Sequence, residues 1–184
     1  MTKFVALFLV LVSTTVYAGK KNEHRHHEAH VHGGATLSIA FDQLKGKVEF
    51  KAASEGVLGF EHEAKSEKDK KKLNDTIAKF ETSIGSMVKF DESAGCTFVK
   101  EKIEMAAKKE ENDAEEKEHK EHKGEHSDFI ANFSVDCKKD IKSTKVTFDF
   151  SQFKGLKDLD VTLLVGDLQK SVEIKRKPVT IELK

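Results

Sequence analysis

Histidine is the most unusual feature of this sequence of 184 residues. Nine histidines occur, and eight of them fall in two short stretches. The N-terminal cluster comprises His24, His26, His27, His30 and His32, the second cluster comprises His119, His122 and His126, and His62 stands alone. Neutral imidazole is the commonest protein ligand for Zn²⁺ and also suits Cu²⁺ and Ni²⁺. The histidines therefore predict metal binding.

The spacing within both clusters suits a metal ion. His30 and His32 alternate with a valine, so both rings face one side of an extended chain. His119 and His122 are three positions apart and His122 and His126 four apart, which places adjacent pairs on one face if the segment is helical. Glutamates between them add negative potential and could supply an oxygen ligand. We take all nine histidines as candidate metal ligands.

Enzyme motifs are missing from the sequence. It has no HExxH, no Ser or Cys nucleophile motif, no P-loop and no GxGxxG. The His30-Val31-His32 segment lacks the flanking Asp that usually accompanies His-x-His in metallo-hydrolases. Most of the histidines lie in segments that we expect to be flexible, whereas catalysis needs rigid placement. We therefore expect a binding protein with no catalytic residues and no residues for an organic cofactor.

The first eighteen residues have the layout of a secretory signal peptide. A basic start at Lys3 precedes an apolar run from Phe4 to Val12, and Val16 and Ala18 suit cleavage before Gly19. The apolar run is shorter than the about 20 residues that span a bilayer. A retained membrane anchor is the alternative. The sequence thus predicts export to the periplasm, with no stable membrane insertion after cleavage.

Export to an oxidising compartment determines how the two cysteines are interpreted. In an oxidising compartment, the pair Cys96 and Cys137 predicts a disulfide. Metal ligation by this pair is the alternative, although structural zinc sites usually bring cysteines close together in sequence. Cys96 precedes a long polar segment and Cys137 follows it. We therefore expect the disulfide to pin the base of that segment to a sheet.

Composition and charge indicate a single globular domain. The chain is 38% hydrophobic and 35% charged, and thirteen Phe supply most of the aromatic bulk. Its 32 basic and 32 acidic residues balance, which argues against a nucleic-acid partner. We expect a signal peptide at 1–18, a His-rich N-terminal arm at 19–34 and one β-rich metal-binding domain at 35–184.

Apolar and polar residues alternate through most of that domain, which predicts β-strands. The first two strands should form a hairpin with its turn at Lys45-Gly46. Over residues 67–84 the period becomes that of an amphipathic helix, with Ser66 and Asp69 at capping-box spacing and Gly85 at its end. The expected fold class is α+β and mostly β: antiparallel, β-sandwich-like sheets with one amphipathic helix at about 67–84.

Residues 107–128 interrupt the alternation with a His/Glu-rich segment that has almost no apolar side chains. Without an apolar stripe it cannot pack onto a core, so we expect a flexible insert in the domain. A solvated linker with no metal-binding role is the alternative for its first half.

Several short motifs follow one another along the chain. They are His30-Val31-His32-Gly33-Gly34, Gly59-Phe60-Glu61-His62, Ala94-Gly95-Cys96, the acidic His-rich insert and Phe133-Ser134-Val135-Asp136-Cys137. In this order, after a signal peptide and before a run of short strands, they resemble the bacterial zinc-regulated, periplasmic zinc-uptake (ZrgA-like) family. The resemblance covers about residues 28–184.

The resemblance implies a periplasmic protein with a β-rich scaffold that binds zinc through histidine and assists its import. By position, His30 and His32 match the family's opening His-x-His-Gly. His62 matches the histidine after Gly-Phe-Glu. The second histidine cluster falls in the family's variable His-rich loop, so only the residue type carries over.

We therefore predict a zinc-binding protein that captures or buffers Zn²⁺ and assists zinc import. Its partners would be zinc ions and a membrane zinc importer or that importer's periplasmic binding protein. His30, His32 and His62 would form the ordered site, and the other histidines would add weaker, exchangeable sites. A copper or nickel buffer is the first alternative. A small metallo-hydrolase and an envelope interaction protein with incidental histidines follow it.

Overall fold

The computed structural model describes residues 33–107 and 126–184. Its elements there are β1 (Gly34–Asp42), β2 (Lys45–Ala53), α1 (Ser54–Leu58), α2 (Glu67–Met87), β3 (Val88–Phe90), the 3₁₀ turn η1 (Glu92–Ala94), β4 (Thr97–Ala107), β5 (Ser127–Asp136), β6 (Lys145–Phe148), β7 (Asp158–Val165), β8 (Leu168–Lys175) and β9 (Val179–Glu182). The expected signal peptide, the arm up to residue 32 and the insert from 108 to 125 lie outside the described residues.

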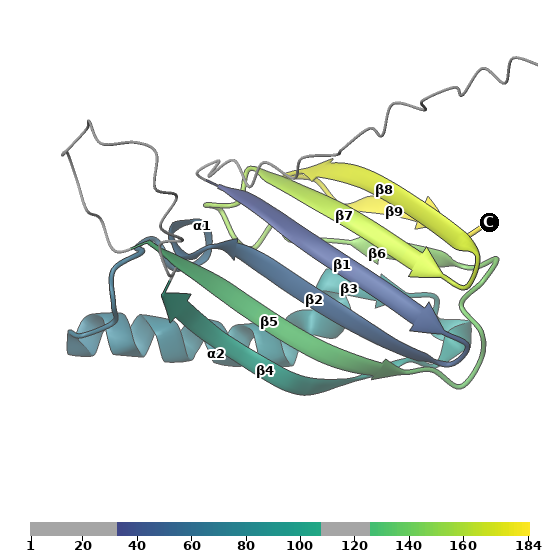
Figure 1. Cartoon of the computed structure of the whole chain (residues 1–184), viewed down its shortest axis with the longest axis horizontal. Coiled ribbons are helices and arrows are strands. Elements are labelled where there is room, and N and C mark those ends of the chain that lie inside the picture. Colours follow the sequence, from purple (N-terminus) through teal and green to yellow (C-terminus); the bar gives the residue numbers. More distant parts are fainter. Residues whose placement is uncertain (1–32, 108–125) are drawn as a thin grey trace, which may run out of the picture.

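Two sheets and one long helix build the domain (Figure 1). The large sheet has the order β4-β5-β2-β1-β7-β8, and the small sheet has the order β3-β6-β9. Helix α2 and the small sheet cover the same face of the large sheet: Phe80 of α2 packs on Phe50, and Phe90 of β3 packs on Phe41, with ring centroids 5.0 and 5.2 Å apart. The mostly β, α+β fold class is confirmed.

One strand pair differs from the expected antiparallel arrangement. β1 and β7 run parallel, with Leu37 opposite Val161. Parallel neighbours need a long crossover connection. Here the chain makes α2, β3 and β6 of the second layer between the two strands, and that layer provides the crossover. The large sheet is therefore mixed.

The ring of Phe80 is the centre of the core. It is fully buried and contacts Phe50, Phe129 and Phe153, with centroid distances of 5.0, 4.9 and 4.6 Å. Alternation in β2 and β5 places Phe50 and Phe129 on the inward face, and Phe153 comes from the loop after β6. Phe80, together with the buried Ile84 and Met87, therefore fixes α2 on the core.

The first hairpin turns two residues earlier than the sequence predicts. Gln43 and Leu44 form the turn, while Lys45 and Gly46 already belong to β2. Gly46 serves a different purpose, because a Cβ there would lie 2.5 Å from the ring of Phe41. The glycine is required by the close approach of that ring, and not by a turn.

Helix α2 begins where the capping box predicts and ends later than expected. The Ser66 side chain accepts a hydrogen bond from the Asp69 backbone N–H. Gly85 does not end the helix, which continues to Met87. The side chains of Ile84 and Met87 are buried, so packing extends the helix past a residue with weak helical preference.

The expected insert is shorter than 107–128. Ala107 is the last residue of β4, and Ser127 and Asp128 are buried residues of β5. β4 is a strand throughout, with a bulge between Lys100 and Lys102. Register with β5 thus extends the hairpin into sequence that looks polar.

The disulfide between Cys96 and Cys137 is present, but its expected position at the base of the insert is wrong. Cys96 precedes β4 and Cys137 follows β5, beside the pair Thr97 and Asp136. The insert joins the opposite ends of the same strands. The disulfide therefore closes the far end of the β4–β5 hairpin.

Candidate metal-binding end of the large sheet

Strand register brings the histidine-bearing segments to one end of the large sheet. A row of paired residues crosses four strands there: Ala35 of β1, Ala52 of β2, Phe129 of β5 and Met105 of β4. Each lies within two residues of its strand's end. We call these strand ends, together with α1 and residues 59–66, the histidine end. Both His-rich segments of the sequence adjoin it.

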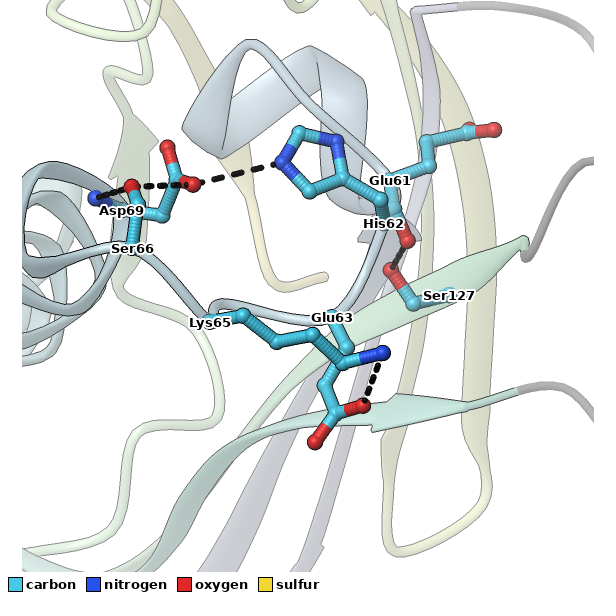
Figure 2. A network of polar contacts seen from close by, with 7 residues as sticks. All are labelled: Glu61, His62, Glu63, Lys65, Ser66, Asp69 and Ser127. Carbon is cyan, nitrogen blue, oxygen red and sulfur yellow. Dashed lines mark hydrogen bonds and ion pairs between the residues drawn. The ribbon is translucent and has the colours of Figure 1, made fainter.

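His62 is held by the helix that follows it. Gly59, with a φ of 82°, ends α1 and redirects the chain. The His62 ring then packs on Phe60, with centroids 4.8 Å apart. Its Nε2 lies 3.3 Å from Asp69 Oδ2, as Figure 2 shows. A contact between the loop and the first turn of α2 thus fixes the imidazole.

Asp69 is itself fixed by the helix cap. Ser66 Oγ donates to Asp69 Oδ2 at 2.6 Å and accepts from the Asp69 N–H at 3.1 Å. The Ser66 hydrogen bond, followed by the contact with His62, holds the pKa of the Asp69 carboxyl below its ordinary value. The carboxylate that faces His62 is therefore ionised at neutral pH.

His126 forms a second imidazole–carboxylate pair, with Glu61. Its Nδ1 lies 2.6 Å from Glu61 Oε2. The next residue, Ser127, is buried and donates from its hydroxyl to the Glu61 carbonyl oxygen at 2.7 Å. Contacts from the start of β5 therefore hold the segment that carries His62 in place.

The two pairs share a pattern of exposure. The side chains of His62 and His126 are 60% and 57% exposed, whereas those of Asp69 and Glu61 are 21% and 17% exposed. Imidazole N–H groups that donate to carboxylates keep the ring in one tautomer and raise its basicity toward a metal. In these tautomers the lone pair is on Nδ1 of His62 and on Nε2 of His126.

The described residues do not form a complete metal site. Over 33–107 and 126–184, no three His, Cys, Asp or Glu side chains are grouped so that they could hold a metal ion. Figure 2 shows why: the Glu61 carboxylate points away from the His62 ring. Zinc in proteins usually takes four ligands. A zinc ion bound here would need ligands from the rest of the chain or from water.

The sequence indicated the histidines as metal ligands, which stays a prediction, and it did not indicate the residues that contact them. The structure places His62 and His126 at one end. The other candidates lie outside the described residues: His24, His26, His27, His30, His32, His119 and His122. The missed residues are Glu61, Asp69 and Ser127. Glu61 lies next to His62 in the sequence and could have been proposed as its neighbour in the site. Asp69 was interpreted only as part of the helix cap.

Histidines that ligate metals in proteins commonly donate their other ring N–H to a carboxylate. The model of the ZrgA family of zinc uptake proteins matches residues 29–183, and the chain belongs to that family. Comparison with curated proteins found no match. No helix in the described part of the chain is long and apolar enough to cross a membrane.

Proposed function

We propose that the protein captures or buffers Zn²⁺ in the periplasm through its histidine clusters and assists zinc import. Membership of a zinc uptake family supports zinc as the cargo. The observation that carries the proposal is the pair of exposed imidazoles, each facing a mostly covered carboxylate, at one end of the sheet. Both His-rich segments of the sequence adjoin that end.

The ligands of the tightest site would come from two parts of the chain. His62 supplies one oriented imidazole. His30 and His32 lie directly before Gly33, which packs close to Gly56 of α1. Their sequence position and the two-residue spacing support them as further ligands. A site assembled from separate segments explains why the described residues alone hold no complete set.

The remaining histidines would provide weaker sites. Ligands in sequence with little apolar content can exchange one at a time, which favours capture and release over tight storage. His126 is intermediate between the ordered ligands and the exchangeable ones, because it follows the insert and is also held by Glu61. This arrangement suits a binding protein that passes zinc on, and it needs no catalytic group.

Export completes the proposal. The signal-peptide layout of residues 1–18 and the Cys96–Cys137 disulfide both suit an oxidising compartment. Zinc would be received there and passed to a membrane importer or to its periplasmic binding protein. The disulfide also makes the two cysteines unsuitable as thiolate ligands.

Calorimetric titration of metal-free 19–184 with Zn²⁺ tests the proposal. The key variant changes His30, His32 and His62 to Ala. A matched control changes His24, His26 and His27 to Ala, which removes the same number of imidazoles. A third variant deletes 108–125 and leaves β4, His126 and β5 intact.

The key variant should lose the tightest site, while the control and the deletion lose only weaker ones. Equal losses in the key variant and the control would contradict an ordered site. Full zinc binding in all three variants would contradict the metal-binding function itself.

A further inference from the structure

A cleft of about 320 Å³ opens between α1, the middle of α2 and the loop after β6. Its walls include Lys72, Thr76 and Lys79 from α2, and Lys154 from the loop. We call it the lysine cleft. Its volume is that of a site for a small molecule. It shares α1 and Gly59 with the histidine end, but none of its lysines is a proposed zinc ligand.

Positive charge in the lysine cleft is not compensated. Among the residues that line it, three lysines face one acid, Glu55. Lys79 Nζ lies 3.3 Å from the Gln152 carbonyl oxygen and 4.8 Å from the centroid of the Phe153 ring. Within the described part of the chain, Lys72, Lys79 and Lys154 form no ion pair. By contrast, Lys70 and Lys71 on the same helix pair with acids of that helix.

Thr76 contributes a hydroxyl to the wall of the lysine cleft. Thr76 is only 5% exposed, and its side chain makes no hydrogen bond to any described residue. Most threonines in helices can donate to a carbonyl of the preceding turn, as Thr82 does to Ala78 at 2.9 Å. The Thr76 hydroxyl is not a fully buried orphan, because among the described residues only Ser54 Oγ is buried without a hydrogen-bond partner. The Thr76 hydroxyl is therefore available to a ligand in the cleft.

The cleft is preformed by backbone packing. Gly56 of α1 and Gly155 of the loop contact each other so closely that a Cβ at Gly155 would collide with the Gly56 carbonyl oxygen. A Cβ at Gly56 would lie 3.0 Å from Leu156 Cδ2. The two walls are thus locked together. A ligand would meet the lysines without a large rearrangement, which lowers the cost of binding.

We propose that the lysine cleft binds a small oxyanion with two or more negative charges, of the phosphate or polycarboxylate class. The Thr76 hydroxyl donates to one oxygen of the anion. The ammonium groups of Lys72, Lys79 and Lys154 neutralise its charge. Charge-assisted hydrogen bonds of this kind are stronger than neutral ones, and in a partly enclosed site they are screened less than at an open surface.

Titration of metal-free 19–184 at low ionic strength tests this proposal, with inorganic phosphate and citrate as separate probes. The first variant is Lys72→Gln/Lys154→Gln. Its control, Lys68→Gln/Lys71→Gln, removes the same charge from α2 outside the cleft. The second variant, Thr76→Val, keeps the shape and removes the hydroxyl. Binding is followed by calorimetry, and folding by the thermal midpoint without anion.

The cleft variant should bind the preferred anion at least about tenfold more weakly, and Thr76→Val about tenfold more weakly, while the control stays within about twofold. Without anion, Thr76→Val should melt no lower than the parent, because its hydroxyl has no partner to lose. Absence of saturable binding for both anions, or an equal loss in the control, would overturn the proposal. Zinc plays no part in either result.

Discussion

The two ends of the β4–β5 hairpin are built in opposite ways. At one end the Cys96–Cys137 disulfide closes the hairpin, and the Cys137 N–H donates to the Leu44 carbonyl oxygen at 2.8 Å. At the other end the contacts are polar side-chain pairs, with His126 and Ser127 against Glu61. The strands separate these ends by about 30 Å, since β4 has 11 residues at about 3.3 Å each.

This difference separates stability from binding. The covalent end constrains the unfolded chain by about 3–4 kcal/mol on the chain-entropy model. The imidazole–carboxylate contacts at the histidine end involve exposed imidazoles, and exposed polar pairs of this kind contribute little to stability. There the carboxylates orient the imidazoles, and the other nitrogen of each ring remains available to a metal. A scaffold fixed at its far end keeps its register while a metal binds.

Removal of the disulfide gives the largest expected effect. Cys96→Ser/Cys137→Ser should lower the free energy of unfolding by about 3–4 kcal/mol, measured by urea denaturation. Its zinc affinity should equal that of the parent, because no metal ligand moves. A matching loss of zinc affinity under conditions where the variant is folded would show that the two ends are coupled.

Asp69→Asn should weaken the tightest zinc site about tenfold. The amide keeps the size of the side chain but loses the charge that orients His62, and such supporting carboxylates contribute about 10–100-fold in metal affinity. Calorimetry measures the change. Asp75→Asn is the control, because Asp75 lies on the same helix and its carboxylate pairs with Lys71. A similar loss in that control would assign the effect to helix charge.

Ser127→Ala should lower the free energy of unfolding by about 1 kcal/mol, because it removes a partly buried hydrogen bond to the Glu61 carbonyl oxygen. Hydrogen exchange should increase over residues 59–66 and remain unchanged beside the disulfide. Faster exchange at both ends would contradict the separation between them.

The smallest expected effect is a dependence on acid pH at the histidine end. The pKa of Asp69 is lowered from 3.8 in the folded state, first by Ser66 and then by His62. Its charge thus stabilises the fold above about pH 3.8, and that contribution is lost as pH falls through the lower folded value. The difference in unfolding free energy between the parent and Asp69→Asn should shrink as the pH falls below about pH 4. If the difference grew as the pH fell, the Asp69 charge would not stabilise the fold, and the prediction would be contradicted.

The sequence predicted what depends on local period and composition. Alternation indicated most of the strands, the stripe through Phe80 indicated the helix, and Ser66 with Asp69 indicated its start. The cysteine pair indicated the disulfide. These features depend on residues close in sequence or on the chemistry of one residue type.

Long-range geometry could not be predicted in the same way. Which end of the hairpin carries the disulfide depends on the register of β4 against β5, and that register extends into a polar stretch at Ala107 and Ser127. The contact between Asp69 and His62 depends on a chain reversal at Gly59. The lysine cleft depends on α1. That helix has only five residues and no periodic pattern, so the sequence does not predict it.

The central claim is that the histidine end binds zinc through imidazoles held by carboxylates. Nitrogen NMR of the histidine side chains, recorded while metal-free 19–184 is titrated with Zn²⁺, tests it most directly. Before zinc, His62 should be protonated on Nε2 and His126 on Nδ1. The first equivalent of zinc should shift Nδ1 of His62. An unchanged His62 ring while other histidines respond would contradict the account.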